Sequence, residues 1–208
     1  MAKAKKTRKK KPAPQCSILA FDQSTTSVGW ALLCGWRNKH PLIQYGVIQP
    51  DGDLNERLDA MWHPIHGIIT KSRYINPVHL VLEGYSYGSR NNRETMGEAV
   101  GIIKAAAFDV GVMPSEVEAI AIPDWKKAIY PTWPGWTKKN WEAAKRKGAF
   151  QHSQPDKIAI RHKLIELFGL NVQEEDAADA VGIAVAFNDK RYDREWMTDH
   201  GKAFIKEE

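Results

Sequence analysis

The chain has 208 residues, of which 43% are hydrophobic and 26% charged, a composition typical of a single soluble globular domain. Its two cysteines are too few for a disulfide framework or a zinc site, and its apolar stretches are too short to cross a membrane. The net charge of +5 is uneven, because residues 1–11 hold seven basic side chains and the rest of the chain carries −2.

Residues 1–15 are basic and contain proline, and we expect them to form a disordered arm because a block of like charges repels itself. Such arms often contact nucleic-acid phosphates, although a plain solubility tail would have the same composition. No secretory apolar region follows this start, and the few cysteines fit a reducing compartment. We therefore expect a cytoplasmic protein with no membrane partner.

The first half of the chain predicts three strands, a helix and a fourth strand. The three strands are joined by short links that indicate an antiparallel meander, and they span Ser17–Asp22, Val28–Cys34 and Leu42–Ile48. Apolar residues spaced three and four apart from Leu58 to Ile69 then predict the helix. The short apolar run His79–Glu83 predicts the fourth strand.

The second half predicts a helix at Glu94–Val110, a fifth strand at Val117–Ala121 and a helix from Ser153 to Phe168. A last helix opens at Glu175 and runs to about Val185. Residues 130–152 read as a Trp- and Lys-rich insertion, and residues 191–208 as a polar tail. The order predicts one α/β domain over residues 16–190, with a five-stranded mixed sheet and helices on both faces.

Four acids occupy positions suited to chemistry. Asp22 ends the first strand and Glu83 the fourth, and Asp176 and Asp179 share one face of the last helix. Each has an ordinary explanation as a turn or helix-start residue, so the combination carries the prediction. Four carboxylates in one cleft need a cation, and oxygen ligands favour Mg²⁺, with Mn²⁺ as a substitute. Two such ions about 3.5–4 Å apart suit phosphodiester cleavage.

Several segments resemble motifs of the RuvC family. They are Ile18–Ser24 with Gly29-Trp30, then Val81–Glu83, then Gly97–Gly101, and finally Asp176–Ala180. Their order and spacing agree across about residues 17–187. The resemblance implies an RNase H-like fold and a Mg²⁺-dependent homodimer that nicks four-way DNA junctions symmetrically. It also implies that Asp22, Glu83, Asp176 and Asp179 are the catalytic, metal-binding acids.

The same resemblance places Lys126 and Lys157 on basic residues that contact DNA near the site. Tyr85 or Tyr87 could take the place of the family's junction-stacking aromatic. Further candidate DNA contacts are Arg90 and Arg93, and Lys138 and Lys139 in the insertion. The aromatic and basic residues of the insertion fit stacking on opened nucleotides, and equally a Trp-packed lid or a dimer contact.

Other functions remain open at this point. An RNase H-like nuclease could instead cut flaps, forks or RNA–DNA hybrids, since a fold does not determine the substrate. The segment Asp22–Ser27 also resembles a phosphate loop of actin-like sugar kinases, but 208 residues are too few for the two domains of that fold. A non-catalytic DNA binder is a third class, and the presence of all four acids argues against it.

Overall fold

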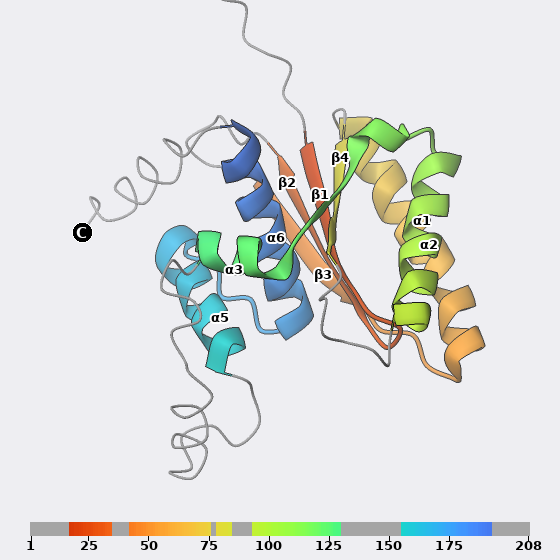
Figure 1. Ribbon diagram of the computed structural model, residues 1–208, viewed down its shortest axis with the longest axis horizontal. Helices are drawn as coiled ribbons and strands as arrows, with labels where there is room; N and C mark the ends of the chain where they lie inside the picture. Colours follow the sequence, from red (N-terminus) through yellow and green to blue (C-terminus); the bar gives the residue numbers. More distant parts are fainter. Residues whose placement is uncertain (1–16, 35–41, 76–77, 85–92, 130–154, 193–208) are drawn as a thin grey trace, which may run out of the picture.

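A computed structural model describes residues 17–34, 42–75, 78–84, 93–129 and 155–192. Its centre is a five-stranded sheet in the order β3-β2-β1-β4-β5 (Figure 1). The strands are β1 (Ser17–Gln23), β2 (Val28–Cys34), β3 (Leu42–Ile48), β4 (Val78–Glu83) and β5 (Val117–Ile120). The helices are α1 (Leu54–Ile75), α2 (Arg93–Asp109), α3 (Ile122–Ile129), α5 (Pro155–Phe168) and α6 (Glu175–Tyr192), with the short 3-10 helix η1 (Pro114–Glu116) before β5.

The sheet is mixed, as predicted. Strands β1, β2 and β3 pair antiparallel, whereas β1 pairs parallel with β4 and β4 pairs parallel with β5. In the register of the first parallel pair, Phe21 lies beside Leu82. Because parallel strands end at the same edge of a sheet, the ends of β1 and β4 emerge together there.

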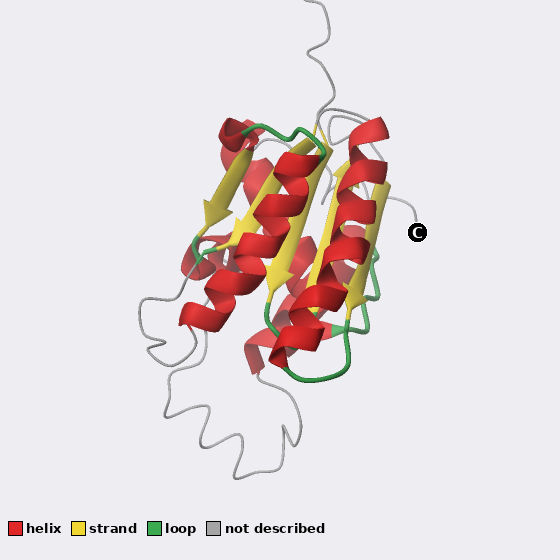
Figure 2. Ribbon diagram, turned by 90° about the vertical axis from the view of Figure 1, so that its right-hand side faces the viewer, coloured by secondary structure: helices red, strands yellow, loops and turns green. Residues whose placement is uncertain are grey.

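The two faces of the sheet are covered by different helices (Figures 1 and 2). Successive side chains of a strand alternate between faces. Ile18 and Ala20 therefore pack into the core beneath α6, α3 and α5, and Leu19 and Phe21 into the core beneath α1 and α2. The prediction of helices on both faces is confirmed.

Helix α3 was not expected from the sequence. It has only eight residues, and two of its side chains, Trp125 and Ile129, are fully buried. Ile122, Trp125 and Ile129 follow a helical spacing, but the helix is shorter than the window of about 11–18 residues over which such a period is recognised. Helix α6 is also longer than expected, because it continues to Tyr192.

Several sequence predictions lie outside the described residues. They are the arm at residues 1–15, the insertion at 130–152, the helix start at Ser153 and the part of the polar tail beyond residue 192. Within the described part of the chain, no helix combines the length and the apolar character that a membrane span requires.

Candidate active site

Asp22 and Glu83 lie at the same edge of the sheet and on the same face. Asp22 continues the alternation of Ile18 and Ala20, and Glu83 continues that of Val81, so both carboxylates belong to the face that α6 covers. The negative charge of Glu83 raises the pKa of Asp22, so the two carboxyl groups lie close together. The sequence-based expectation that these acids meet at one edge therefore agrees with the structure.

The first turn of α6 brings Asp176 and Asp179 to this edge. A Cβ atom added to Gly29, the β2 neighbour of Asp22, would lie 2.0 Å from the carbonyl oxygen of Asp176. Only a residue without a side chain allows the helix to come so close to the strand. The intervening Ala177 and Ala178 are buried against the sheet, and Asp179 is itself only 6% exposed.

The four acids influence one another electrostatically. Burial, together with the negative charges of Glu83 and Asp176, raises the pKa of Asp22 to about 8. Burial also raises the pKa of Glu83, and the negative charge of Asp179 raises it as well. The hydrogen bond from Trp125 lowers it, but burial has the larger effect. A cation placed among these groups would relieve both the repulsion and the cost of burying their charge.

Three side chains hold the acids in place, and this role was not predicted from the sequence for any of them. The buried Gln23 amide donates from Nε2 to the Glu83 carbonyl oxygen at 2.6 Å and accepts at Oε1 from the Glu83 N–H at 3.2 Å. The Trp125 indole donates from Nε1 to Glu83 Oε1 at 2.9 Å. The Ser27 hydroxyl donates to Asp176 Oδ2. The position of Gln23 directly after the strand-end acid was the available signal for it.

The Ser/Thr-rich turn after β1 is closed by its own hydrogen bonds. The Ser24 hydroxyl donates to the Ser27 carbonyl at 2.7 Å and accepts from the Ser27 N–H at 3.0 Å. The Thr25 carbonyl accepts from Arg57 Nε of α1 at 2.8 Å. With Ser27 bonded to Asp176, the hydroxyls of Ser24 and Ser27 stabilise the turn and position the acid. The phosphate-loop interpretation gains no support from this arrangement.

Two of the predicted DNA contacts lie beside the acids. Lys157 of α5 has its Nζ 3.2 Å from Glu175 Oε2 and 3.8 Å from Asp176 Oδ1. Burial favours a lower pKa for Lys157, but the negative charges of Asp179, Glu175 and Asp176 outweigh it and raise the pKa. Lys126 lies over the Trp125 ring, 5.3 Å from its centroid, and lowers the pKa of both strand-end acids.

The remaining candidate DNA contacts fall where the structure gives no side-chain position. Tyr85, Tyr87, Arg90, Lys138 and Lys139 lie outside the described residues. Arg93 begins α2, and only its backbone is described. Their role in DNA binding stays a prediction.

The donor set at this edge fits a hard divalent cation, because it consists of carboxylate oxygens. Asp22, Glu83, Asp176 and Asp179 are the residues that would hold it. As the side chains of the described residues stand, no three His, Cys, Asp or Glu groups are close enough together to share one ion. Ion binding therefore requires at least one of these side chains to move toward the others.

Two hollows lie elsewhere on the described surface. One of about 520 Å³ lies between the C-terminal ends of α1 and α2, is lined by residues such as His66, Arg73 and Asp109, and includes none of the four acids. A smaller one of about 150 Å³ touches Glu83 on the side of α2, with Lys104 at its wall. Only the second adjoins the acidic edge.

The sheet order and the placement of the helices define an α/β fold of the RNase H-like class. Among solved structures, RuvC of Thermus thermophilus matches with a TM-score of 0.54 and 17% identity, over 84% of this chain and 95% of that chain. T. thermophilus RuvC in complex with a Holliday junction substrate matches with a TM-score of 0.56 and 18% identity, over 82% and 91%. The chain therefore has the RuvC-like form of this fold.

A further match is weaker. The yeast mitochondrial Holliday junction resolvase has a TM-score of 0.41 and 13% identity, over 92% of this chain and 82% of that chain, and no conclusion rests on it. The sequence matches no protein-family model and no curated protein. At these identities the similarity establishes the fold, and function has to be argued from the site.

Proposed function

We propose that the protein is a metal-dependent endonuclease that resolves four-way DNA junctions by paired, symmetric nicks. The observation that carries the proposal is the meeting of carboxylates from β1, β4 and α6 at one edge of a RuvC-like sheet.

The chemistry follows from the donor set. Two Mg²⁺ or Mn²⁺ ions per site would supply an activated water and charge stabilisation for the leaving 3′ oxygen. Asp22, Glu83, Asp176 and Asp179 are the residues that would hold them. Lys126 and Lys157 supply positive charge at the rim, where a phosphate of the cut strand would lie.

The partner follows from the fold and the charge pattern. The matching T. thermophilus RuvC was solved with a Holliday junction substrate, and we extend that substrate class to this chain as part of the proposal. The seven basic residues in 1–11 would add phosphate contacts that carry little structural discrimination. Paired nicks require two sites related by a two-fold axis, so we propose a homodimer, with α2 as its contact helix. Sedimentation with and without junction DNA tests this state.

The deciding experiment is a cleavage panel of four-way junctions, forks, flaps, linear duplexes and RNA–DNA hybrids, with and without Mg²⁺. We expect metal-dependent, symmetric cutting of the junction above all other substrates. The variants Asp22→Asn, Glu83→Gln, Asp176→Asn and Asp179→Asn should each lose on the order of 10³-fold or more of turnover. They should keep junction binding, because each removes a negative charge near phosphate.

The panel also separates the alternatives. Preferential cutting of flaps, forks or hybrids would support the nuclease activity but contradict the four-way junction as its substrate. Near-normal turnover in two of the four variants would mean that the metal site is wrongly assigned. Tight binding without cleavage in either Mg²⁺ or Mn²⁺ would instead favour a non-catalytic DNA binder.

A further inference from the structure

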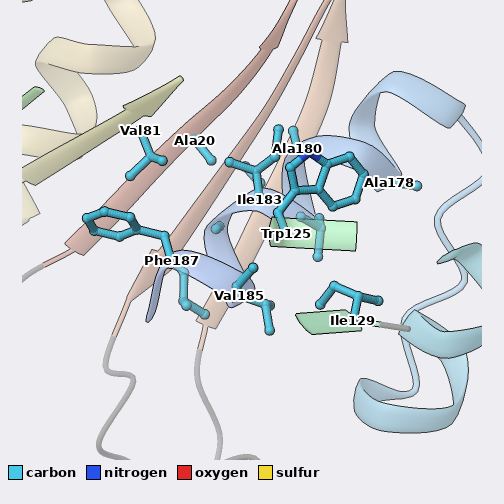
Figure 3. Packing of buried hydrophobic residues seen from close by; sticks show 14 of the residues in the cluster. Ala20, Val81, Trp125, Ile129, Ala178, Ala180, Ile183, Val185 and Phe187 are labelled. Atoms are coloured by element: carbon cyan, nitrogen blue, oxygen red, sulfur yellow. The ribbon is translucent and has the colours of Figure 1, made fainter. Parts of the chain in front are cut away.

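Trp125 has an environment that its role in the core does not explain. It is fully buried on α3, and its ring packs against α6 at Gly182, where an added Cβ would lie 2.9 Å from a ring carbon (Figure 3). Its indole N–H is directed to the Glu83 carboxylate at 2.9 Å. A buried indole needs a hydrogen-bond partner, but a neutral backbone carbonyl would satisfy it equally well.

The choice of a carboxylate matters because of the way Glu83 is held. The Gln23 amide fixes its backbone through both the N–H and the carbonyl. That clamp leaves the side-chain torsions of Glu83 free, and a long carboxylate has several rotamers. The indole bond fixes one carboxylate oxygen, and a hydrogen bond to a charged acceptor is roughly twice as strong as one between neutral groups.

The position of Trp125 also links two parts of the acidic edge. The same ring that bonds to β4 through Glu83 packs on α6, which carries Asp176 and Asp179. The next residue, Lys126, lies over the ring and faces the strand-end acids. One turn of α3 therefore contacts both Glu83 and the helix that carries Asp176 and Asp179.

We propose that Trp125 is a positioning residue for the divalent-cation site: its N–H holds the Glu83 carboxylate in the rotamer that an ion requires, and its packing on Gly182 ties that rotamer to the placement of α6. This role rests on the proposed function, since it presumes that Glu83 binds a metal ion. Trp125 itself touches neither substrate nor ion.

The test compares Trp125→Phe with wild type, using Trp62→Phe as the matched control. Trp62 lies on α1, where its ring stacks on His66 at a centroid distance of 5.9 Å, away from the acids. Mn²⁺ binding is measured by calorimetry on the full chain without DNA. We expect Trp125→Phe to weaken Mn²⁺ binding by about 10- to 100-fold, the range for residues that orient metal ligands, and Trp62→Phe to leave it unchanged.

A second variant covers the case in which the smaller Phe ring destabilises the fold. Trp125→benzothienylalanine keeps the shape of the indole and replaces its N–H with sulfur. It should unfold at the wild-type temperature yet weaken Mn²⁺ binding like Trp125→Phe. Junction cleavage by this variant should fall at low metal concentration and recover at high Mn²⁺, with an unchanged KM for DNA.

Nuclear magnetic resonance gives an independent readout. The Trp125 indole N–H signal, assigned by its absence from Trp125→Phe, should move as Mg²⁺ is added to the wild-type protein and stay still in Glu83→Gln. A benzothienylalanine variant that binds Mn²⁺ with wild-type affinity would overturn the role of Trp125 while leaving the nuclease intact. A wild-type protein that binds no Mn²⁺ would overturn the proposed function, and this role with it.

Discussion

The two faces of the sheet use the same strands for different purposes. Toward α1 and α2 the sheet and helices present large side chains that are fully buried, such as Phe21, Met61 and Ile103. Where α6 crosses the other face, small residues such as Ala20 and Gly29 let the helix approach the strands. Large side chains hold a helix away from a sheet, whereas small ones let its backbone come into contact with the strands.

This difference explains why the four candidate acids lie on one face. The close approach at Gly29 puts the acids of α6 beside those of β1 and β4. The face beneath α1 and α2 stabilises the sheet by burying apolar area and contributes no acid to the site. Changes on the two faces should therefore separate stability from activity, and the predictions below run from the largest expected change in the free energy of unfolding to the smallest.

Removing a large side chain beneath α1 and α2 should affect stability alone. Ile103→Ala deletes a fully buried side chain of α2, and we expect a loss of about 2–5 kcal/mol, measured by urea unfolding. Cleavage per folded molecule should stay within about twofold of wild type, because the acidic edge belongs to the other face. A much larger loss of turnover at a temperature where the variant is fully folded would show that the two faces are coupled.

Adding one methyl group beneath α6 should reduce activity more than stability. Gly29→Ala places a Cβ where the Asp176 carbonyl now lies, so the start of α6 has to move away from β2. We expect about 1–3 kcal/mol of destabilisation from overpacking and a loss of turnover much larger than that of Ile103→Ala. Urea unfolding and junction cleavage measure the two effects.

The matched control is Gly67→Ala on α1, where an added Cβ meets no atom within 4 Å. Because alanine favours a helix over glycine, this variant should gain up to about 1 kcal/mol and cleave normally. Equal turnover in the two glycine variants would contradict the explanation based on helix approach.

The buried acids should make the stability of the metal-free protein depend on pH. The pKa of Asp22 is about 8 in the folded chain against 3.8 ordinarily, so between these values the folded state binds a proton that the unfolded state has lost. Stability should therefore fall as the pH rises from about 4 to about 8, and the stabilisation by added Mg²⁺ should grow over the same range.

Thermal unfolding at a series of pH values, with and without Mg²⁺, measures this dependence. Asp22→Asn should flatten the fall, because an amide does not titrate. The control is Asp59→Asn, which changes an exposed acid on α1. This variant should show the same fall in stability with rising pH as the wild type. A metal-free stability that rises from pH 5 to pH 8 would mean that Asp22 is ionised in the folded protein.

The smallest effect concerns the lysine at the acidic edge. Lys157→Met removes ion pairs to Glu175 and Asp176 from a side chain that is 24% exposed, and we expect a loss of at most about 1 kcal/mol without metal. Lys163→Met, which breaks a more exposed pair with Glu166, should cost about 0.5 kcal/mol or less. Added Mg²⁺ should bring the free energies of unfolding of the two variants closer together, because ions at Asp176 would replace the positive charge of the lysine.

Binding to junction DNA distinguishes the two lysines further. Lys157→Met should reduce the slope of log affinity against log salt concentration by the amount for about one phosphate contact. Lys163→Met should leave this slope unchanged. Identical salt slopes for both variants would mean that Lys157 stabilises the start of α6 and does not contact DNA.

The sequence alone determined the elements that rest on local patterns. The strands containing Asp22 and Glu83 are continuous apolar runs, and β2 and β3 occupy the predicted residues. Their period and their turn residues are properties of neighbouring positions, which a single sequence displays. The spacing of Asp176 and Asp179 likewise placed both acids on one helical face before any tertiary contact was known.

The tertiary structure alone decided how the acids are held. Trp125 lies 42 positions from Glu83 and Ser27 lies 149 from Asp176, so no local pattern could pair them. The sequence gives no sign that Gly29 differs from any other strand glycine. Only the packing of α6 against it shows why a side chain there would clash. Contacts between distant segments depend on how the elements pack, and packing depends on the volumes of side chains from all of them at once. For that reason the four candidate acids could be predicted from the sequence, whereas the residues that contact and orient them could not.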